Sequence, residues 1–258
     1  MADEGFRLFL YMIIGFIAGL WFFVKGLILL KRKQLIENTP TSNTRGIAMG
    51  PVEVYGEVLL KKDSVKLTSP FTKKPCIYYR YLIQEYRYQG KSSRWVTLDS
   101  GQADTRFFLK DDADKVLVDP AKAMIEIPAN NTFNSGIGKN PPAMIVDFLN
   151  KSKIKDEGLF GINKTMRYTE YFIEPGDKIY IMGTAGKNPE VDELAAQQSM
   201  ENVMIQDRKG AFFYISDRPE KEILKSFRNK MLLYTIGGAA LSSACLAGIL
   251  LYTGLLFA

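Results

Sequence analysis

The chain opens and closes on long apolar stretches that carry almost no charge. Leu8–Val24 contains no charged residue, and after Lys25 the apolar run continues as far as Leu30. As a helix, Phe6–Leu30 would reach about 37 Å, more than the roughly 30 Å of a bilayer core. Met231–Ala258 is also free of charge. We therefore predict one transmembrane helix at each end of the chain.

A cleaved signal peptide is the alternative for the first stretch. Such peptides begin with basic residues and end in small residues at a cleavage site. Here the chain begins with the acidic sequence MADEG, and the apolar run is followed by Lys31–Lys33. An uncleaved anchor is therefore favoured.

Between these stretches, from about residue 45 to 215, apolar and polar positions alternate with the period of two that is typical of β-strands. Pro142–Lys151 instead has helical spacing, and 189–202 has the composition of a short helix or a loop. The predicted strands are 52–58, 77–88, 94–98, 105–110, 115–118, 167–173, 178–184, 203–206 and 211–215, with the last two forming a hairpin. The pattern predicts a mainly β (β-rich α+β) soluble domain between two transmembrane α-helices.

Three regions follow from this pattern. Residues 1–33 form the N-terminal transmembrane anchor, and 34–216 form the β domain, beginning with a polar linker. Residues 217–258 form a juxtamembrane helix that continues into the C-terminal transmembrane helix. Asp217 and Glu220 resemble a capping box at the start of that helix.

Two turns are predicted within the β domain. Glu174–Asp177 has proline at its second position and glycine at its third, which suits a type II turn. Asp111, Asp112 and Asp114 could together bind a hard cation. They lack the glycine and the distal glutamate of a calcium loop, so a solvated hairpin turn is favoured.

Small residues recur at spacings that allow close helix contact in lipid. Gly15 and Gly19 form one such pair, and Ala240, Ala244 and Gly248 repeat every four positions. We expect the two helices to pair with each other or to associate with further copies of the chain. A homo-oligomer through these small-residue faces is one consequence.

The charges predict the orientation of the chain and one of its partners. The formal net charge is +6, and basic residues flank the inner ends of both apolar stretches. By the positive-inside rule, the β domain then lies in the cytoplasm. The same side chains would attract anionic lipid, so the bilayer itself is an expected partner, whereas nucleic acid is not. These basic residues are Lys31, Arg32, Lys33, Lys221, Lys225, Arg228 and Lys230.

Composition excludes several kinds of chemistry. The sequence has two cysteines and no histidine, so it cannot supply the eight ligands of a zinc-binding RING or a histidine-based catalytic triad. Without a histidine to activate it, Cys76 is interpreted as a packed thiol. We expect no catalytic, cofactor-binding or metal-binding residue and no cofactor.

One charged pair is predicted to be structural. Arg80 and Glu170 each stand between apolar or aromatic neighbours on the same face of a predicted strand. A charge in that position is costly to bury without a partner. We therefore predict that Arg80 and Glu170 meet in a charge-assisted pair, the alternative being that each points into solvent.

Five segments together resemble the GIDE domain, also called the "beside a membrane" domain. That family includes a mitochondrial ubiquitin ligase and shorter prokaryotic relatives, and the resemblance covers nearly the whole chain, so we expect a prokaryotic relative in the cell membrane. In the ligase a RING follows the second span, and its β domain faces the intermembrane space; this chain differs in both respects. The segments are Asn38–Gly56, Ser69–Tyr81, Phe107–Pro120, Arg167–Ala185 and Phe213–Ile223.

Three hypotheses of function remain open. The first is a non-enzymatic module that recruits or scaffolds an unidentified protein partner at the membrane surface. The second, implied by the resemblance to RING-type ubiquitin ligases, is a ligase-like component that acts with a partner in trans. The third is a subunit of an oligomeric membrane complex. For the third, Lys25 near a helix end is the only charge within the two apolar runs, which is unfavourable for a lone transporter.

Overall fold

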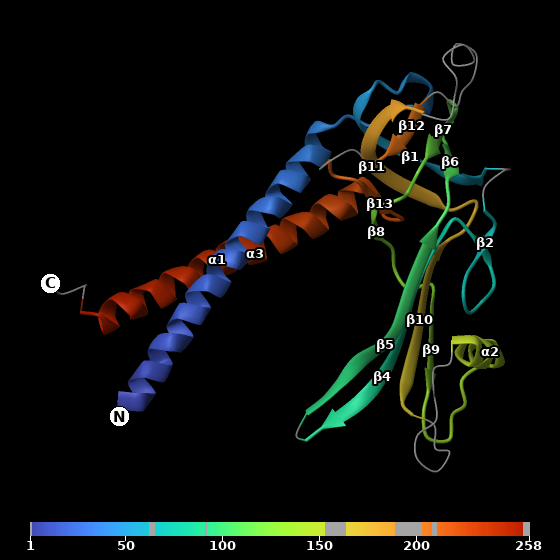
Figure 1. The fold of residues 1–258 in the computed structure, drawn as a ribbon. Helices are drawn as coiled ribbons and strands as arrows, with labels where there is room; N and C mark the ends of the chain where they lie inside the picture. The colour runs from blue at the N-terminus through green and yellow to red at the C-terminus, as the bar shows by residue number, and fades with distance from the viewer. Residues whose placement is uncertain are drawn as a thin grey trace. The chain divides into compact units, whose positions relative to one another are not determined.

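The computed structural model describes residues 2–61, 65–90, 92–152, 164–188, 203–207 and 211–254, so the segment 189–202, predicted as a helix or loop, lies outside it. Two compact units are present: residues 1–40 with 219–258, and residues 41–218 (Figure 1). The first unit holds α1 (Ala2–Asn38) and α3 (Glu220–Tyr252). The second holds η1 (Thr44–Gly46), α2 (Ala143–Ser152) and β1 (Gly50–Leu60), β2 (Leu67–Thr68), β3 (Pro75–Cys76), β4 (Tyr78–Gln89), β5 (Ser92–Asp104), β6 (Phe107–Lys110), β7 (Lys115–Val118), β8 (Met124–Glu126), β9 (Asn131–Ser135), β10 (Met166–Ile173), β11 (Lys178–Lys187), β12 (Val203–Gln206) and β13 (Tyr214–Ser216). The predicted fold class, a β-rich domain flanked by two helices that could span a membrane, is confirmed.

Both terminal helices are long and apolar enough to cross a membrane. α1 extends beyond its predicted end and includes residues 34–38, which were assigned to a linker. The sequence there consists largely of good helix formers, and Lys33 pairs with Glu37 one turn later at 2.5 Å. α3 begins at Glu220, and Pro219 occupies its N-cap position without a side-chain hydrogen bond. The predicted capping box of Asp217 and Glu220 is therefore wrong.

A closed barrel forms the larger part of the β domain. Its strands pair in the order β1–β6–β7–β12–β11, and β11 pairs back with β1 to close the ring. β13 and β8 extend the sheet from the side of β11. The predicted hairpin of 203–206 and 211–215 is wrong, because β12 and β13 each pair with β11 at different positions along it. Closure leaves few open strand edges in this part of the domain.

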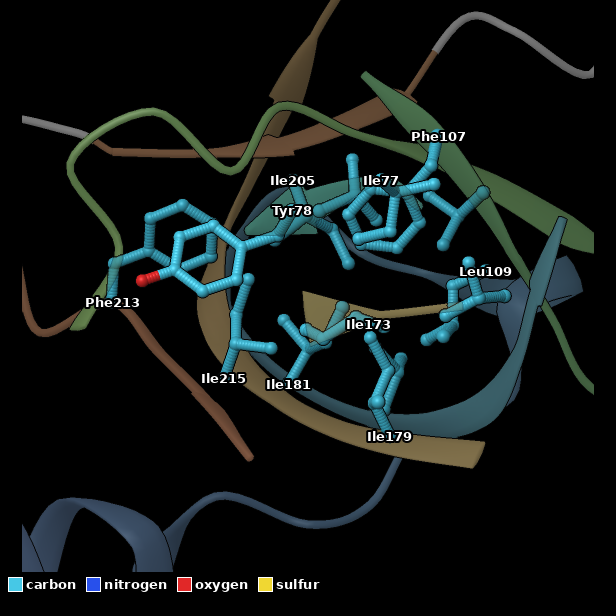
Figure 2. Close-up of a cluster of buried hydrophobic side chains, with 14 of the residues drawn as sticks. Ile77, Tyr78, Phe107, Leu109, Ile173, Ile179, Ile181, Ile205, Phe213 and Ile215 are labelled. Atoms are coloured by element: carbon cyan, nitrogen blue, oxygen red, sulfur yellow. The ribbon is translucent and has the colours of Figure 1, made fainter. Parts of the chain in front are cut away.

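The barrel interior is filled by the inward-facing residues of the alternating strands. Ile179, Ile181 and Ile205 belong to this core, and the rings of Tyr78 and Phe213 lie at one side of it (Figure 2). Gly56 occupies a position in β1 where a side chain would collide with the carbonyl oxygen of Lys110. The glycine allows β1 to approach β6 closely where β1 passes from its pairing with β11 to its pairing with β6.

A second sheet has the order β5–β4–β10–β9. The helix α2 packs on one face of it, where Ile145 and Leu149 join a core cluster with Phe71, Ile83 and Tyr168. Tyr78 and Ile173 stand at the ends of β4 and β10 and also belong to the barrel core. These two strands therefore connect the barrel to the second sheet within one domain.

The two predicted turns are present, but the aspartates of one are not simply solvated. Gly176 has a φ of 94° and the amide of Asp177 donates to the carbonyl of Glu174, as a type II turn requires. In the other turn, the carboxylate of Asp111 accepts hydrogen bonds from the amides of Ala113 and Asp114 and from both the amide and the hydroxyl of Thr44. Asp111 thereby links η1, at the start of the domain, to the β6–β7 turn by hydrogen bonds.

Candidate membrane anchor and binding surface

The two terminal helices pack against each other in antiparallel directions. A Cβ atom added to Gly19 would lie 2.6 Å from the amide nitrogen of Ser242, and one added to Gly26 would lie 2.8 Å from that of Thr235. On the other helix, a Cβ on Gly238 would lie 2.5 Å from the nitrogen of Phe23. Glycine at these positions allows the backbones to meet, which is a common basis of helix association in lipid.

The predicted small residues divide between two faces. Gly15 and Gly248 lie in this contact with Gly19, since an added Cβ would meet Cys245 or Met12 of the facing helix. Ala240 and Ala244 are exposed and lie outside it. The pairing of the two helices thus uses the Gly238 and Ser242 face, and self-association through the exposed alanines stays a prediction.

The basic flanks of the two helices lie at the same end of the helix pair. Gly26 lies against Thr235, and Lys31–Lys33 and Arg228–Lys230 each begin within roughly 10 Å of rise from that contact. Lys221 and Lys225 continue the series, and their spacing places them on one face of α3 with Arg228. Lys25 lies over the ring of Trp21 at 3.6 Å from its centroid.

Glu170 is fully buried and organises the loop between β2 and β3. Its carboxylate accepts hydrogen bonds from the amide of Phe71 at 2.7 Å and the amide of Thr72 at 3.3 Å. The hydroxyl of Thr72 donates at 2.8 Å, and the side-chain amide of Asn131 lies at 3.5 Å. These hydrogen bonds occupy the acceptor positions of the carboxylate, so the role of Glu170 is to stabilise the loop.

The structure does not bring Arg80 and Glu170 together. In the register of β10 and β4, Arg80 is opposite Tyr171 and Glu170 is opposite Tyr81, so the two charges point to opposite faces of the sheet. The guanidinium of Arg80 stacks on the ring of Tyr171 at 4.1 Å. The error was a one-residue difference in register, which single-strand patterns do not specify.

Cys76 is a buried thiol at the end of β3. Burial first, and then the carboxylates of Glu170 and Glu174, raise its pKa to about 12. A thiol in this state is almost entirely protonated at neutral pH and is a poor nucleophile. This agrees with its interpretation as a packed residue.

A small hollow lies beside the β10–β11 turn. Its volume is about 180 Å³, below the roughly 300–1,000 Å³ typical of small-molecule pockets. It offers little room to enclose a substrate. Its walls include Ile127, Pro128, Asn130, Phe172, Ile173, Asp177, Lys178, Ile179 and Asp217.

The face of the second sheet opposite α2 carries a series of half-buried arginine and aromatic side chains. There the guanidinium of Arg167 stacks on the ring of Trp95 at 3.9 Å, and Tyr86 packs beside Trp95 with 5.1 Å between ring centroids. Tyr88 is 78 % exposed at the end of this aromatic series. Arg80 stacks on Tyr171 further along the same face. We refer to these six residues as the arginine–aromatic face, which sequence reasoning missed because its members come from three different strands.

A barrel domain set between two apolar helices defines a β-domain protein with two candidate membrane spans. Comparison with family models places it more closely: residues 78–250 match GIDE, described as E3 ubiquitin ligase, and the chain belongs to that family. The comparison with curated proteins and the comparison with solved structures gave no match.

Proposed function

We propose that this chain is a non-enzymatic recruiting module, whose β domain is held at the membrane surface by two transmembrane helices and binds a protein partner there. The observation that carries the proposal is that three side chains capable of chemistry have structural roles. Glu170 and Asp111 are bound to backbone and side-chain donors, and Cys76 is buried and protonated. The arginine–aromatic face is half-buried apart from the exposed Tyr88, and its arginines are instead available for binding.

The orientation is part of the proposal. The basic residues at one end of the helix pair would lie on the cytoplasmic side under the positive-inside rule, and the β domain would follow them into the cytoplasm. A cysteine introduced at the exposed position Lys178 should then react with an impermeant maleimide only after the cells are opened. Reaction in sealed cells would place the β domain outside.

Recruitment can be tested by proximity labelling from the full chain. A labelling enzyme is fused to the intact chain and to a control in which the same two helices flank an unrelated soluble domain. The proposal predicts proteins that are labelled only when this β domain is present. Identical labelling by the two proteins would contradict recruitment.

One alternative is a ligase component that acts in trans, since the matching family is described as E3 ubiquitin ligase. A RING needs eight zinc ligands from cysteine or histidine, and the chain has two cysteines and no histidine. Purified chain should therefore bind no stoichiometric zinc and transfer no ubiquitin by itself. If adding a RING protein produced ubiquitin conjugates only in the presence of this chain, the trans ligase would replace simple scaffolding.

A further inference from the structure

We propose that the arginine–aromatic face binds an extended acidic segment of a partner protein, with its carboxylates on Arg167 and Arg80. This inference rests on the proposed recruiting function and names where the partner binds and by what chemistry. The face comprises Arg80, Tyr86, Tyr88, Trp95, Arg167 and Tyr171, contributed by β4, β5 and β10.

The two arginines are held in place while their donors remain unused. The guanidinium carbon of Arg167 lies over the ring of Trp95 at 3.9 Å from its centroid, and that of Arg80 lies over the ring of Tyr171 at 4.1 Å. Neither makes a hydrogen bond or an ion pair with a residue that the structure describes, and Nε of Arg80 is buried without a hydrogen-bond partner. A guanidinium held over an aromatic ring has its position restricted before a ligand arrives. A carboxylate matches this planar fork by two parallel hydrogen bonds.

The spacing of the two arginines fits an extended chain. Arg167 is opposite Gln84 and Arg80 is opposite Tyr171, so the two sites are four strand residues apart. At about 3.4 Å per residue this is roughly 14 Å. Side chains four residues apart in an extended peptide point to the same side and span the same distance. Two such acidic residues would reach both guanidinium groups at once.

The surroundings favour an anion between the two positions. The residues of β4 and β10 that share this face between the arginines, Leu82, Gln84 and Thr169, carry no charge. On this face, no acidic residue of these two strands therefore lies between the two cations, and Asp104 of β5 stands opposite Tyr78, beyond Arg80. The exposed ring of Tyr88 adds apolar area at the distal end, where an aromatic or aliphatic side chain of the partner could pack.

Single-stranded nucleic acid is the other anion that binds aromatic and basic surfaces. It requires free aromatic faces on which bases stack and a groove of several cations that follows the phosphates. Here the face of Trp95 is covered by Arg167, and that of Tyr171 by Arg80. Apart from the exposed ring of Tyr88, the groups left available are guanidinium groups rather than aromatic faces, so an acidic peptide fits better.

The test uses the full chain in nanodiscs of a neutral phospholipid and a fluorescein-labelled oligoglutamate peptide, with binding followed by fluorescence anisotropy. We expect saturable binding that weakens about tenfold or more in the double variant Arg80→Gln with Arg167→Gln, since each arginine contributes charge-assisted hydrogen bonds. Arg167→Lys keeps the charge but loses the planar fork, and it should also weaken binding. Thermal unfolding of each variant checks that the domain still folds.

Arg94→Gln is the matched control. Arg94 is an exposed arginine of the same β4–β5 hairpin, next to Trp95 in sequence and therefore on the opposite face. Its substitution removes one charge and should leave the affinity unchanged. The single variant Arg167→Gln is measured beside it. If Arg94→Gln weakens peptide binding as much as Arg167→Gln does, net charge alone explains binding and the proposal is overturned.

Two further outcomes would also overturn it. One is the absence of peptide binding, and the other is tighter binding of a single-stranded oligonucleotide or of anionic vesicles at the same face. Proximity labelling with the double arginine variant separates this failure from failure of the proposed function. If the wild-type domain recruits proteins and the variant recruits the same set, recruitment stands and this face is not its site.

Discussion

Glu170→Gln tests the role of the buried carboxylate most directly. The substitution keeps the size and shape of the side chain but removes its charge. In the wild-type protein two short hydrogen bonds reach this carboxylate, from the amide of Phe71 at 2.7 Å and from the hydroxyl of Thr72 at 2.8 Å. The amide oxygen of glutamine can still accept from Phe71, and its NH2 group must then face the Thr72 hydroxyl, which is able to turn and accept.

The magnitude follows from the loss of charge assistance. Hydrogen bonds to an ionised group stabilise the fold by about 1.5–3 kcal/mol, against about 0.5–1.5 kcal/mol for neutral ones. Two weakened bonds therefore lower the free energy of unfolding by about 2 kcal/mol in Glu170→Gln. Glu170→Ala removes every acceptor and leaves the buried amide of Phe71 without a partner, so about 3–5 kcal/mol is expected.

Urea unfolding of the full chain in neutral nanodiscs measures these differences. When Trp21 is replaced by phenylalanine, the remaining tryptophan is Trp95, and its fluorescence reports unfolding of the β domain. Glu57→Gln is the matched control, because Glu57 is an exposed residue of β1 and its substitution should change stability by about 0.5 kcal/mol or less. Amide hydrogen exchange at Phe71 and Thr72 gives a local reading and should accelerate in the Glu170 variants.

The reasoning would be refuted if Glu170→Ala unfolded at the same urea concentration as the Glu57→Gln control. It would also be refuted if stability fell while exchange at Phe71 and Thr72 stayed at the wild-type rate. The second result would mean that Glu170 stabilises the domain by some route other than the loop that it caps.

Three other outcomes are expected. Gly238→Leu should lower the thermal midpoint of the helix pair by inserting a side chain into its closest contact, whereas Gly237→Leu, which has open space around it, should not; equal effects would contradict the contact. Burial raises the pKa of Asp111, but hydrogen bonds from Thr44 and from the turn outweigh it and lower the pKa from 3.8 to about 2. The stability from this carboxylate is thus present above about pH 4 and lost as the pH falls towards 2, by about 1–2 kcal/mol after solvent screening, and Asp111→Asn should abolish that loss in acid unfolding. Cys76 should resist alkylation at pH 8 in the folded chain and react on unfolding, as mass spectrometry of its peptide would show; fast labelling of folded protein would disprove its burial.

The terminal helices and most strands could be predicted from sequence because their patterns are local. Val203–Gln206 and Lys115–Val118 were predicted with the bounds that the structure gives. β9 was missed, since its sequence Asn131–Ser135 is polar and pairs only at the edge of the second sheet. β8 is three residues long and depends on β13 for its pairing. Such strands form because they pair with neighbouring strands, and a local sequence pattern does not contain that information.

The same limit applied to the sites. Alternation correctly placed Tyr168, Glu170 and Phe172 on one face of β10, but register decided what that face meets. Glu170 bonds to a loop far away in sequence, and Arg167 stacks on a ring from a third strand. Contacts of this kind depend on how strands align, and a shift of one residue changes every partner.

The packing of α1 against α3 has a consequence for the stability of the β domain. When the two helices are in contact, residues 41–218 form a loop whose ends are held together, as a disulfide would hold them. In the chain-entropy model, closing a loop of about 180 residues disfavours the unfolded chain by about 5 kcal/mol. A substitution within the bilayer that separates the helices, such as Gly238→Leu, would therefore release conformational entropy in the unfolded domain and weaken a fold that it does not touch.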